Sequence, residues 1–314
     1  MKRGALNILS RVVLVLAFIL CQPGTSFGKM LVGIIMTADI PYYADMHKAF
    51  TENLKSKLPA GEDVDFILQR PFPDPIAWSN AARKLIAIEV DVIVSYGAPA
   101  TQAVLYEKSR IPVVYAGVYD PEVALLNTKA TTGCGYKIPL SSLLRYFKQI
   151  KEMRKLRVVY SSNEEDSVRQ MVEVANLSKK QNIPLARVDI RSHGDLRKFK
   201  EVGKNDAIYI TGSALAHIWI EDILSMLWQK RVPSVDIFPD SAELGVLITL
   251  YQPPEQQGKK AAEIVAKLID GEQIENIPPE ILRTTELVFN QNEGNKMGIT
   301  FPLQLIVEAT KVIK

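Results

Sequence analysis

The sequence predicts an α/β protein with two doubly wound, parallel-sheet lobes. Apolar, strand-like runs such as LVGIIM (31–36) and VDVIVSY (90–96) lack polar alternation and are separated by amphipathic helices. This pattern is typical of parallel strands that are covered on both faces. Two such series of four to five strands follow one another, the second starting near residue 140. A length of 314 residues leaves room for two domains.

The first series begins at Met30. Strands are expected at 31–36, 64–68, 90–96 and 111–116, and helices at 44–58, at 79–89 and in a short segment that opens at Pro99. Met46, Phe50 and Leu54 fall on one face of helix 44–58, which is the spacing of a helix that packs on a sheet. Pro99 suits the first turn of a helix, because no helical hydrogen bond needs the N–H that proline lacks.

The second series predicts strands in LARVDI and at 155–161, 206–212, 233–238 and 245–251, with helices in SLLRYFKQIKEM, at 164–181, after LARVDI and through IEDILSMLWQ. A helix at 256–272 follows, and the YQPPEQ segment before it indicates that the chain passes between the lobes more than once. The predicted first lobe comprises residues 29–137 and about 251–275, and the second lobe residues 138–250. A strand in LVFN and a helix in FPLQLIVEATKVI end the chain, and the sequence leaves open which lobe holds residues 276–314.

The first 28 residues have the layout of a secretory signal. Basic residues flank an apolar block at 12–21, and small residues follow it. Ser26 and Gly28 place small side chains at the −3 and −1 positions for cleavage before Lys29. The apolar block is shorter than the roughly 20 residues that cross a bilayer as a helix. We therefore expect an exported, periplasmic protein.

An alternative for this segment is a lipoprotein signal that carries its lipid on Cys21. Leu20 stands where that processing favours Gly, Ala or Ser, so the soluble exported form is the preferred interpretation. In both cases the folded part lies outside the cytoplasm.

Composition argues against several classes of function. Without residues 1–28 the chain has 35 basic and 35 acidic residues, so it lacks the surplus of cations that a nucleic-acid binder needs. Cys134 is then the one remaining cysteine, which leaves no internal disulfide. His47, His193 and His217 are far apart in the sequence, so a zinc site is not expected, nor is any other cofactor. No second long apolar segment follows the signal.

The segments after the predicted strands are where a ligand is expected, because open parallel sheets bind ligands beyond the carboxyl ends of their strands. These segments are TADIPYY (37–43), GAPATQ (97–102), GVYDPE (117–122), SSNEEDS (161–167), TGSA (211–214) and FPDSAE (238–243). They are rich in aromatic, small and hydroxyl side chains. The predicted ligand-binding residues are Asp39, Tyr42, Tyr43, Gly97, Ala98, Thr101, Tyr119, Asp120, Asn163, Ser167, Ser213, Asp240 and Tyr251.

These residue types suit recognition of a small molecule. Gly97 and Ala98 let the backbone approach a ligand, and the N-terminus of the following helix offers N–H groups to an anionic group. Tyr42, Tyr43 and Tyr119 are able to stack on a ligand or to hydrogen-bond with it. The alternative is that some of these tyrosines only cover the edge of the core.

Catalytic patterns are weak by comparison. His217 is the one plausible base for a serine nucleophile, but no G-x-S-x-G motif accompanies any serine. Asp39 and Asp120 offer paired carboxylates for glycoside hydrolysis, yet both are equally expected as turn or cap residues. GAPAT and TGSA match neither the Walker pattern nor the dinucleotide-binding glycine pattern. The sequence thus indicates a recognition cleft rather than an active site.

The ordered set DVIVSYGAPATQA, IPVVYAGVYDPEVALL, RVVYSSNEEDSV, DAIYITGSA and LITLYQPPEQQGKKAAEIVAKLIDGE resembles the substrate-binding proteins of ABC transporters of the tryptophan/tyrosine type. The resemblance covers about residues 31–312. It implies a type I periplasmic-binding fold, in which two lobes joined by a three-strand hinge close over a small ligand, often an aromatic amino acid. It also places TADIPYY, GAPATQ, VYDP and SSNEEDS as ligand loops, with Glu164 and Ser167 matching the usual residues.

Two positions depart from that pattern. Ser213-Ala214 stand where the family commonly has an Asp-Asn pair, and Phe238-Pro239 stand where it commonly has an acidic pair, with Asp240 close by. Those acids suit an α-amino group, so other small organic solutes stay open beside aromatic amino acids. The predicted function is capture of such a ligand for the permease and ATPase of an ABC importer. The alternatives are a ligand-sensing partner of a membrane receptor and an exported hydrolase.

Overall fold

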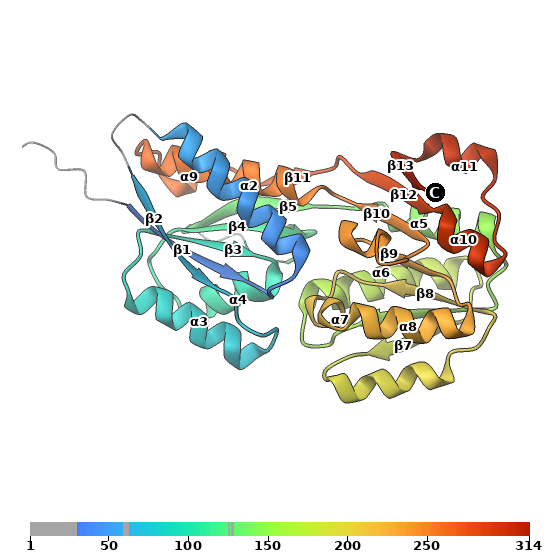
Figure 1. The fold of residues 1–314 in the computed structure, drawn as a ribbon. Coiled ribbons are helices and arrows are strands. Elements are labelled where there is room, and N and C mark those ends of the chain that lie inside the picture. Colours follow the sequence, from blue (N-terminus) through green and yellow to red (C-terminus); the bar gives the residue numbers. More distant parts are fainter. Residues whose placement is uncertain (1–29, 59–62, 125, 127–128) are drawn as a thin grey trace, which may run out of the picture.

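The computed structural model describes residues 30–58, 63–124, 126 and 129–314 (Figure 1). The predicted secretory signal and the lipid anchor at Cys21 lie outside these residues. Figure 1 shows two lobes side by side, each with its own sheet and helices, and with several strands running between them. The predicted fold class, two α/β lobes of the type I periplasmic-binding kind, is confirmed. Within the described ranges no helix combines the length and the apolar character that a membrane span requires.

The first lobe is built on a parallel sheet with the strand order β11-β5-β4-β3-β1-β2. Its strands are β1 (Met30–Met36), β2 (Val64–Gln69), β3 (Val92–Tyr96), β4 (Val113–Tyr119), β5 (Thr131–Tyr136) and β11 (Glu280–Leu282). Helices α2 (Pro41–Lys57) and α9 (Pro254–Ile269) cover one face, and α3 (Pro75–Ala87) and α4 (Ala98–Tyr106) cover the other. Both faces of β1 are therefore buried: Ile34 packs on the α2 side and Ile35 on the α3 side.

The second lobe repeats this arrangement in a sheet with the order β13-β12-β10-β9-β8-β6-β7. Its strands are β6 (Lys155–Tyr160), β7 (Leu185–Asp189), β8 (Asp206–Ile210), β9 (Ser234–Asp236), β10 (Ile248–Tyr251), β12 (Glu286–Asn290) and β13 (Lys311–Ile313). Its helices are α5 (Leu140–Ile150), α6 (Glu165–Lys180), α7 (Ala214–Ile218), α8 (Ile220–Lys230), α10 (Gln291–Met297) and α11 (Leu303–Glu308), with short turns η1 (His193–Glu201) and η2 (Pro239–Ala242). Strand β12 runs antiparallel to β10, and the other pairs are parallel.

The chain crosses between the lobes three times within the described ranges. It leaves the first sheet after β5, returns after β10 to form α9, and leaves again between β11 and β12. The last strands and helices, β12, α10, α11 and β13, belong to the second lobe (Figure 1). The two lobes are thus joined by three segments of the described chain. The residue limits of the two domains stay a prediction.

Strand β5 was not expected from the sequence. Its residues TTGCGY include two glycines and no continuous apolar run, so the usual strand signal is missing. The glycines are needed for close packing: a Cβ at Gly133 would lie 2.2 Å from the carbonyl oxygen of Tyr115, and one at Gly135 would lie 2.6 Å from Cδ of Pro121.

Candidate ligand-binding cleft

The carboxyl ends of the two sheets face each other across a cleft. Helix α2, which follows β1, contacts η2, which follows β9, and α4, which follows β3, contacts α6, which follows β6. Tyr42 of the first lobe stacks on Phe238 of the second, with ring centroids 4.1 Å apart and planes 10° apart. The lobes are therefore in direct contact, and we call this arrangement closed.

Aromatic rings from both lobes surround this contact. Tyr43 packs edge-on against Tyr42 with 5.2 Å between centroids, and Tyr136 lies 6.4 Å from Tyr42. The imidazole of His217 lies 4.5 Å from the Phe238 ring. All five side chains are buried. The centre of the cleft is thus an aromatic cluster of Tyr42, Tyr43, Tyr136, Phe238 and His217.

Asp166, in the first turn of α6, joins the two lobes. Its buried carboxylate faces the backbone N–H of Ala98, at the start of α4 in the other lobe. Burial raises the pKa of Asp166, although the Arg169 guanidinium and several N–H donors act in the opposite direction. In the closed arrangement one N–H of the helix terminus that was expected to meet a ligand anion therefore faces the protein's own carboxylate. The role of Ala98 in ligand binding stays a prediction.

Glu164 precedes α6 and caps a neighbouring helix. Its Oε1 accepts hydrogen bonds from the hydroxyl of Ser213 at 2.7 Å and from the N–H of Leu215 at 3.0 Å, and its Oε2 accepts one from the N–H of Ala214 at 2.6 Å. Burial, together with the nearby Asp166 carboxylate, raises the pKa of Glu164 to about 7. Ser213 is therefore occupied inside the second lobe, at the N-terminus of α7.

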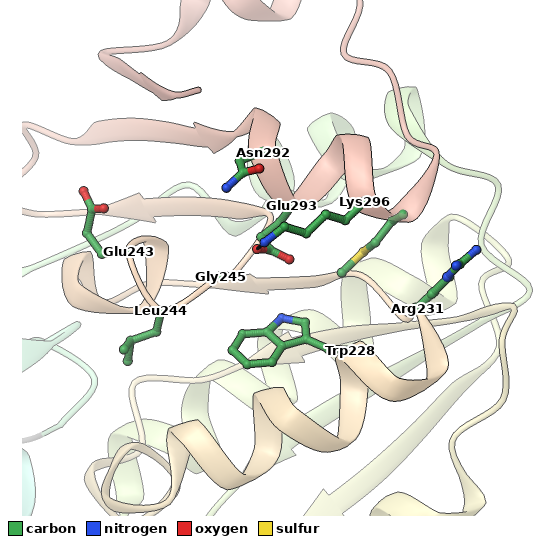
Figure 2. Close-up of a pocket in the computed structure, with 9 residues that line it drawn as sticks. Trp228, Arg231, Glu243, Leu244, Gly245, Asn292, Glu293 and Lys296 are labelled. Atoms are coloured by element: carbon green, nitrogen blue, oxygen red, sulfur yellow. Dashed lines mark hydrogen bonds and ion pairs between the residues drawn. The ribbon is translucent and has the colours of Figure 1, made fainter.

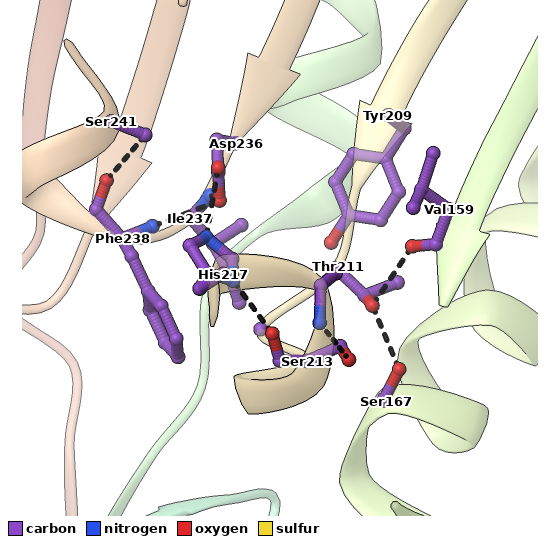
Figure 3. A network of polar contacts seen from close by, with 12 residues as sticks. Val159, Ser167, Tyr209, Thr211, Ser213, His217, Asp236, Ile237, Phe238 and Ser241 are labelled. Atoms are coloured by element: carbon purple, nitrogen blue, oxygen red, sulfur yellow. Dashed lines mark hydrogen bonds and ion pairs between the residues drawn. The ribbon is translucent and has the colours of Figure 1, made fainter. Parts of the chain in front are cut away.

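His217, a member of the aromatic cluster, forms a buried pair with Asp236 (Figure 3). His217 Nε2 lies 3.0 Å from Oδ2 of Asp236, and Nδ1 lies 2.7 Å from the carbonyl oxygen of Ser213. Burial is the largest single effect on His217 and lowers its pKa, but the charge and hydrogen bond of Asp236, the charge of Asp240 and the Ser213 carbonyl together outweigh it and raise the pKa to about 9. The imidazole is protonated at neutral pH and donates from both nitrogens. Neither nitrogen of His217 meets a serine hydroxyl, so this histidine does not form a nucleophile–base pair with a described serine.

Three further predicted residues are bound within their own lobes. Ser167 shares a hydrogen bond of 2.8 Å with Thr211, visible in Figure 3. Thr101 bonds to the Ser95 hydroxyl at 2.9 Å and donates to the carbonyl oxygen of Gly97 at 2.8 Å. Gly97 has a φ of 87°, and a Cβ there would lie 2.5 Å from the hydroxyl oxygens of Thr37 and Tyr43. Only glycine fits this turn.

Tyr119 and Asp120 lie on the hinge side and connect the lobes. The Tyr119 hydroxyl donates to Glu173 of α6 at 2.8 Å. Lys137 bridges Asp120 at 2.6 Å and Glu173 at 2.8 Å. The guanidinium of Arg169 donates to the Tyr119 carbonyl oxygen at 3.1 Å and lines a cavity of about 460 Å³ beside it.

The remaining predicted residues lie nearer the surface. Asp39 is exposed and pairs with Arg70 at 3.4 Å. Asn163 is exposed in a groove of about 280 Å³ between the lobes. The Tyr251 hydroxyl donates to Glu286. Asp240 is partly buried, and its Oδ1 has no hydrogen-bond partner among the described residues. Of the predicted set, the structure brings Tyr42, Tyr43, Gly97 and Ala98 together at the cleft, with Asp240 next to Phe238; their roles in binding stay predictions.

Sequence reasoning did not single out Asp166, Phe238 or Gln170 as site residues. Asp166 stands in the first turn of a helix, where an acidic residue is expected for the helix dipole alone. Phe238 is an ordinary apolar residue after a strand. Gln170 has no sequence signal at all, yet it is fully buried, and its Oε1 accepts from the N–H of Gly212 at 2.8 Å.

A second cavity lies away from the cleft, between α8 and α10 of the second lobe (Figure 2). It has a volume of about 630 Å³, and the Trp228 indole forms its floor against Gly245. Lys296 pairs with Glu293 at 2.6 Å on its rim. None of the predicted ligand-binding residues lines it. No group of three or more His, Cys, Asp or Glu side chains within the described ranges is arranged to hold a metal ion.

Comparison with known proteins decides the family. Residues 44–313 match the family model described as ABC transporter substrate binding protein. The chain belongs to this family. A tyrosine-binding protein from Clostridioides difficile is 22% identical over 271 residues, which cover 83% of this chain and 79% of that protein.

Solved structures of similar shape show the same fold at low identity. A conserved domain protein from Vibrio cholerae has a TM-score of 0.85 and 22% identity, covering 90% of this chain and 99% of that one. The ABC domain from Streptococcus pneumonia in complex with L-Trp has a TM-score of 0.82 and 19% identity, covering 91% and 100%. The fold and the family of this substrate-binding protein thus agree with the sequence-based resemblance.

Proposed function

We propose that this substrate-binding protein works outside the cytoplasm, where it captures a small organic ligand between its lobes and presents it to the permease and ATPase of an ABC importer. The observation that carries the proposal is the aromatic contact across the cleft, where Tyr42 of one lobe stacks on Phe238 of the other. Relatives described as tyrosine-binding or as an L-Trp complex support a small ligand of this size class.

Ligand binding and lobe closure are coupled in this proposal. The Tyr42–Phe238 stack, the bond from Arg169 to the Tyr119 carbonyl and the bond between Gln102 and Glu165 all join the two lobes. In this proposal they form as the lobes approach and are lost as the lobes separate. A ligand stabilises the closed state by the difference between its affinities for the closed and the open state, and the hinge allows the change. The importer then receives the closed form.

The binding test uses the purified protein in two steps. Native mass spectrometry of protein isolated from its own host identifies any small molecule that remains bound. Calorimetric titration of refolded, ligand-free protein then measures the affinity for that molecule or for a panel of amino acids, aromatic acids, amines, sugars and nucleosides.

The matched variant is Phe238→Ala. It removes one face of the stack, and we expect the dissociation constant to rise roughly tenfold to hundredfold. Leu303→Ala, at an exposed position of α11, is the control and is expected to leave binding unchanged. Absence of any bound molecule, of binding to the whole panel and of a change in small-angle scattering would contradict the proposal.

A further inference from the structure

Buried or partly buried carboxylates gather at the cleft, and two of them, Asp166 and Asp240, form no ion pair with a described residue. Glu164 is met by donors at the N-terminus of α7, and Asp236 is paired with His217. Asp166 accepts a hydrogen bond from the N–H of Ser167 at 3.2 Å and faces the N–H of Ala98, with the Arg169 guanidinium further away, and its carboxylate keeps further lone pairs. Asp240 has a buried oxygen, Oδ1, without a partner among the described residues.

The cations beside the cleft are already bound by the protein. Lys137 lies between Asp120 and Glu173, and protonated His217 lies on Asp236. Arg169 donates to the Tyr119 carbonyl and lies 3.6 Å from Glu165. Its Nε alone has no partner in the described part of the chain, and the side chain lines the cavity on the hinge side. A ligand carboxylate at the cleft would therefore meet negative charge before it met a free cation.

Aromatic rings lie near Asp166. The charge of Asp166 raises the pKa of Tyr42, Tyr43 and Tyr136, so the three side chains lie close to this carboxylate. The Tyr42 hydroxyl is buried and makes no hydrogen bond of normal geometry with a described residue, although the Tyr136 hydroxyl lies beside it. Phe238, which stacks on Tyr42, is two residues from Asp240. Aromatic faces next to carboxylates are a favourable environment for an organic cation.

The pKa shifts of Asp166 and Asp240 agree with a site that favours a bound cation. Burial raises the pKa of Asp166 and that of Asp240. For Asp240 the neighbouring Asp236 and Asp45 add to the rise, and His217 opposes it. Arg169 and His217 offset this negative charge without forming an ion pair with Asp166 or Asp240, and a bound cation would add a direct partner.

We propose that the ligand is a small organic cation, an amine or a quaternary ammonium compound without a carboxylate, whose charge is neutralised by Asp166 and Asp240 and whose apolar part packs on Tyr42 and Phe238. The inference rests on the proposed function and names its ligand class. Ser213-Ala214 and Phe238-Pro239 follow β8 and β9 in this chain, and in this proposal Asp166 and Asp240 supply the negative charge at the cleft.

The experiment compares ligands that differ in a carboxylate. Tyramine is titrated beside tyrosine, tryptamine beside tryptophan, and choline beside glycine betaine, all with the refolded full-length mature protein. We expect at least one of the cations to bind, and to bind about tenfold or more tightly than its carboxylate-bearing counterpart. Equal or tighter binding of the carboxylate-bearing compounds would overturn the inference and point to Arg169 as their partner.

Variants then test which carboxylates bind the positive charge of the ligand. Asp166→Asn and Asp240→Asn are each expected to weaken binding of the cation by about tenfold or more. Asp270→Asn removes one negative charge from an exposed position at the end of α9 and is expected to leave binding unchanged. Melting temperatures show that each variant is folded. Unchanged affinity in both cleft variants would also overturn the inference.

Failure of this inference is distinguishable from failure of the proposed function. If the protein from its own host carries a neutral, anionic or zwitterionic molecule and none of the cations binds, the ligand class is wrong while the proposed function stands. If no molecule is carried and nothing in either panel binds, both proposals fall.

Discussion

At the scale of single residues, the His217–Asp236 pair stabilises the second lobe through charge that is hidden from solvent. Both side chains are almost completely buried, so each ion depends on the other. We expect His217→Ala to lower the free energy of unfolding by about 3–5 kcal/mol, because Asp236 is left buried without its partner. His193→Ala is the matched control. That ring is mostly exposed beside Asp222, and its loss is expected to cost roughly 0–1 kcal/mol.

The pair also sets a pH dependence. The folded pKa of His217 is raised above the value of an unfolded histidine, so its stabilising effect is complete below about pH 6.5 and is lost as the pH rises through about 9. Urea unfolding between pH 6 and pH 10 measures this. The difference between wild type and His217→Ala is expected to shrink over that range, and a constant difference would contradict a protonated imidazole.

Glu164 is expected to lower the stability of the fold as the pH rises, which is opposite to the effect of most carboxylates. Burial raises its pKa to about 7, so the folded state holds a proton that the unfolded state has already lost. The stability of the wild type therefore has a component that declines as the pH rises from about 4.5 to 7. Glu164→Gln keeps an oxygen for Ser213 and Leu215 and removes the ionisation. Chemical unfolding over this pH range is expected to show a flatter profile for the variant, and parallel profiles would refute the assignment.

At the scale of helices and strands, α2 and α9 pack with unusually close backbones. A Cβ at Gly258 of α9 would lie 2.1 Å from the carbonyl oxygen of Met46 and 2.9 Å from the backbone nitrogen of Phe50. Alanine favours a helix over glycine by about 1 kcal/mol, but here it forces the two helices apart. We expect Gly258→Ala to lower the unfolding free energy by roughly 1–3 kcal/mol. Gly194→Ala, with no atom closer than 3.6 Å, is the control and is expected to be neutral in thermal unfolding.

Elements with a clear apolar period could be predicted, and those that depend on distant packing could not. Helix 44–58 and strand 31–36 carry their pattern in the local sequence, and the structure has them as α2 and β1 within a few residues. Strand β5 depends on Gly133 fitting under Tyr115 of the neighbouring strand, a fact that local sequence does not contain. For the cleft, the order of the strands predicted which segments would meet. It did not predict that Asp166 would face the N–H of Ala98, because that contact requires the relative placement of two lobes.

At the scale of the whole molecule, the closed arrangement depends on contacts that bridge the lobes, and Arg169 provides one of them. Its guanidinium in α6 donates to the Tyr119 carbonyl of the first lobe. A contact present only in the closed state shifts the balance of states by its own free energy, of the order of 1–2 kcal/mol. Arg169→Ala is therefore expected to raise the apparent dissociation constant of the ligand about fivefold to thirtyfold by favouring the open state.

Single-molecule fluorescence transfer measures this shift directly. Outside the predicted signal at 1–28, Cys134 is the one cysteine of the sequence, and it is buried. In a variant that lacks residues 1–28, Lys84→Cys on α3 and Glu221→Cys on α8 therefore accept dyes at exposed positions of the two lobes. The closed fraction at a given ligand concentration is expected to fall in Arg169→Ala and to be unchanged in Arg191→Ala, whose side chain is exposed beside Asp189. If Arg169→Ala weakens binding while the closed fraction at saturation and its ligand-free value stay the same, Arg169 contacts the ligand itself. The bond from Arg169 to the Tyr119 carbonyl would then not contribute to closure. That result would favour a ligand whose carboxylate binds Arg169.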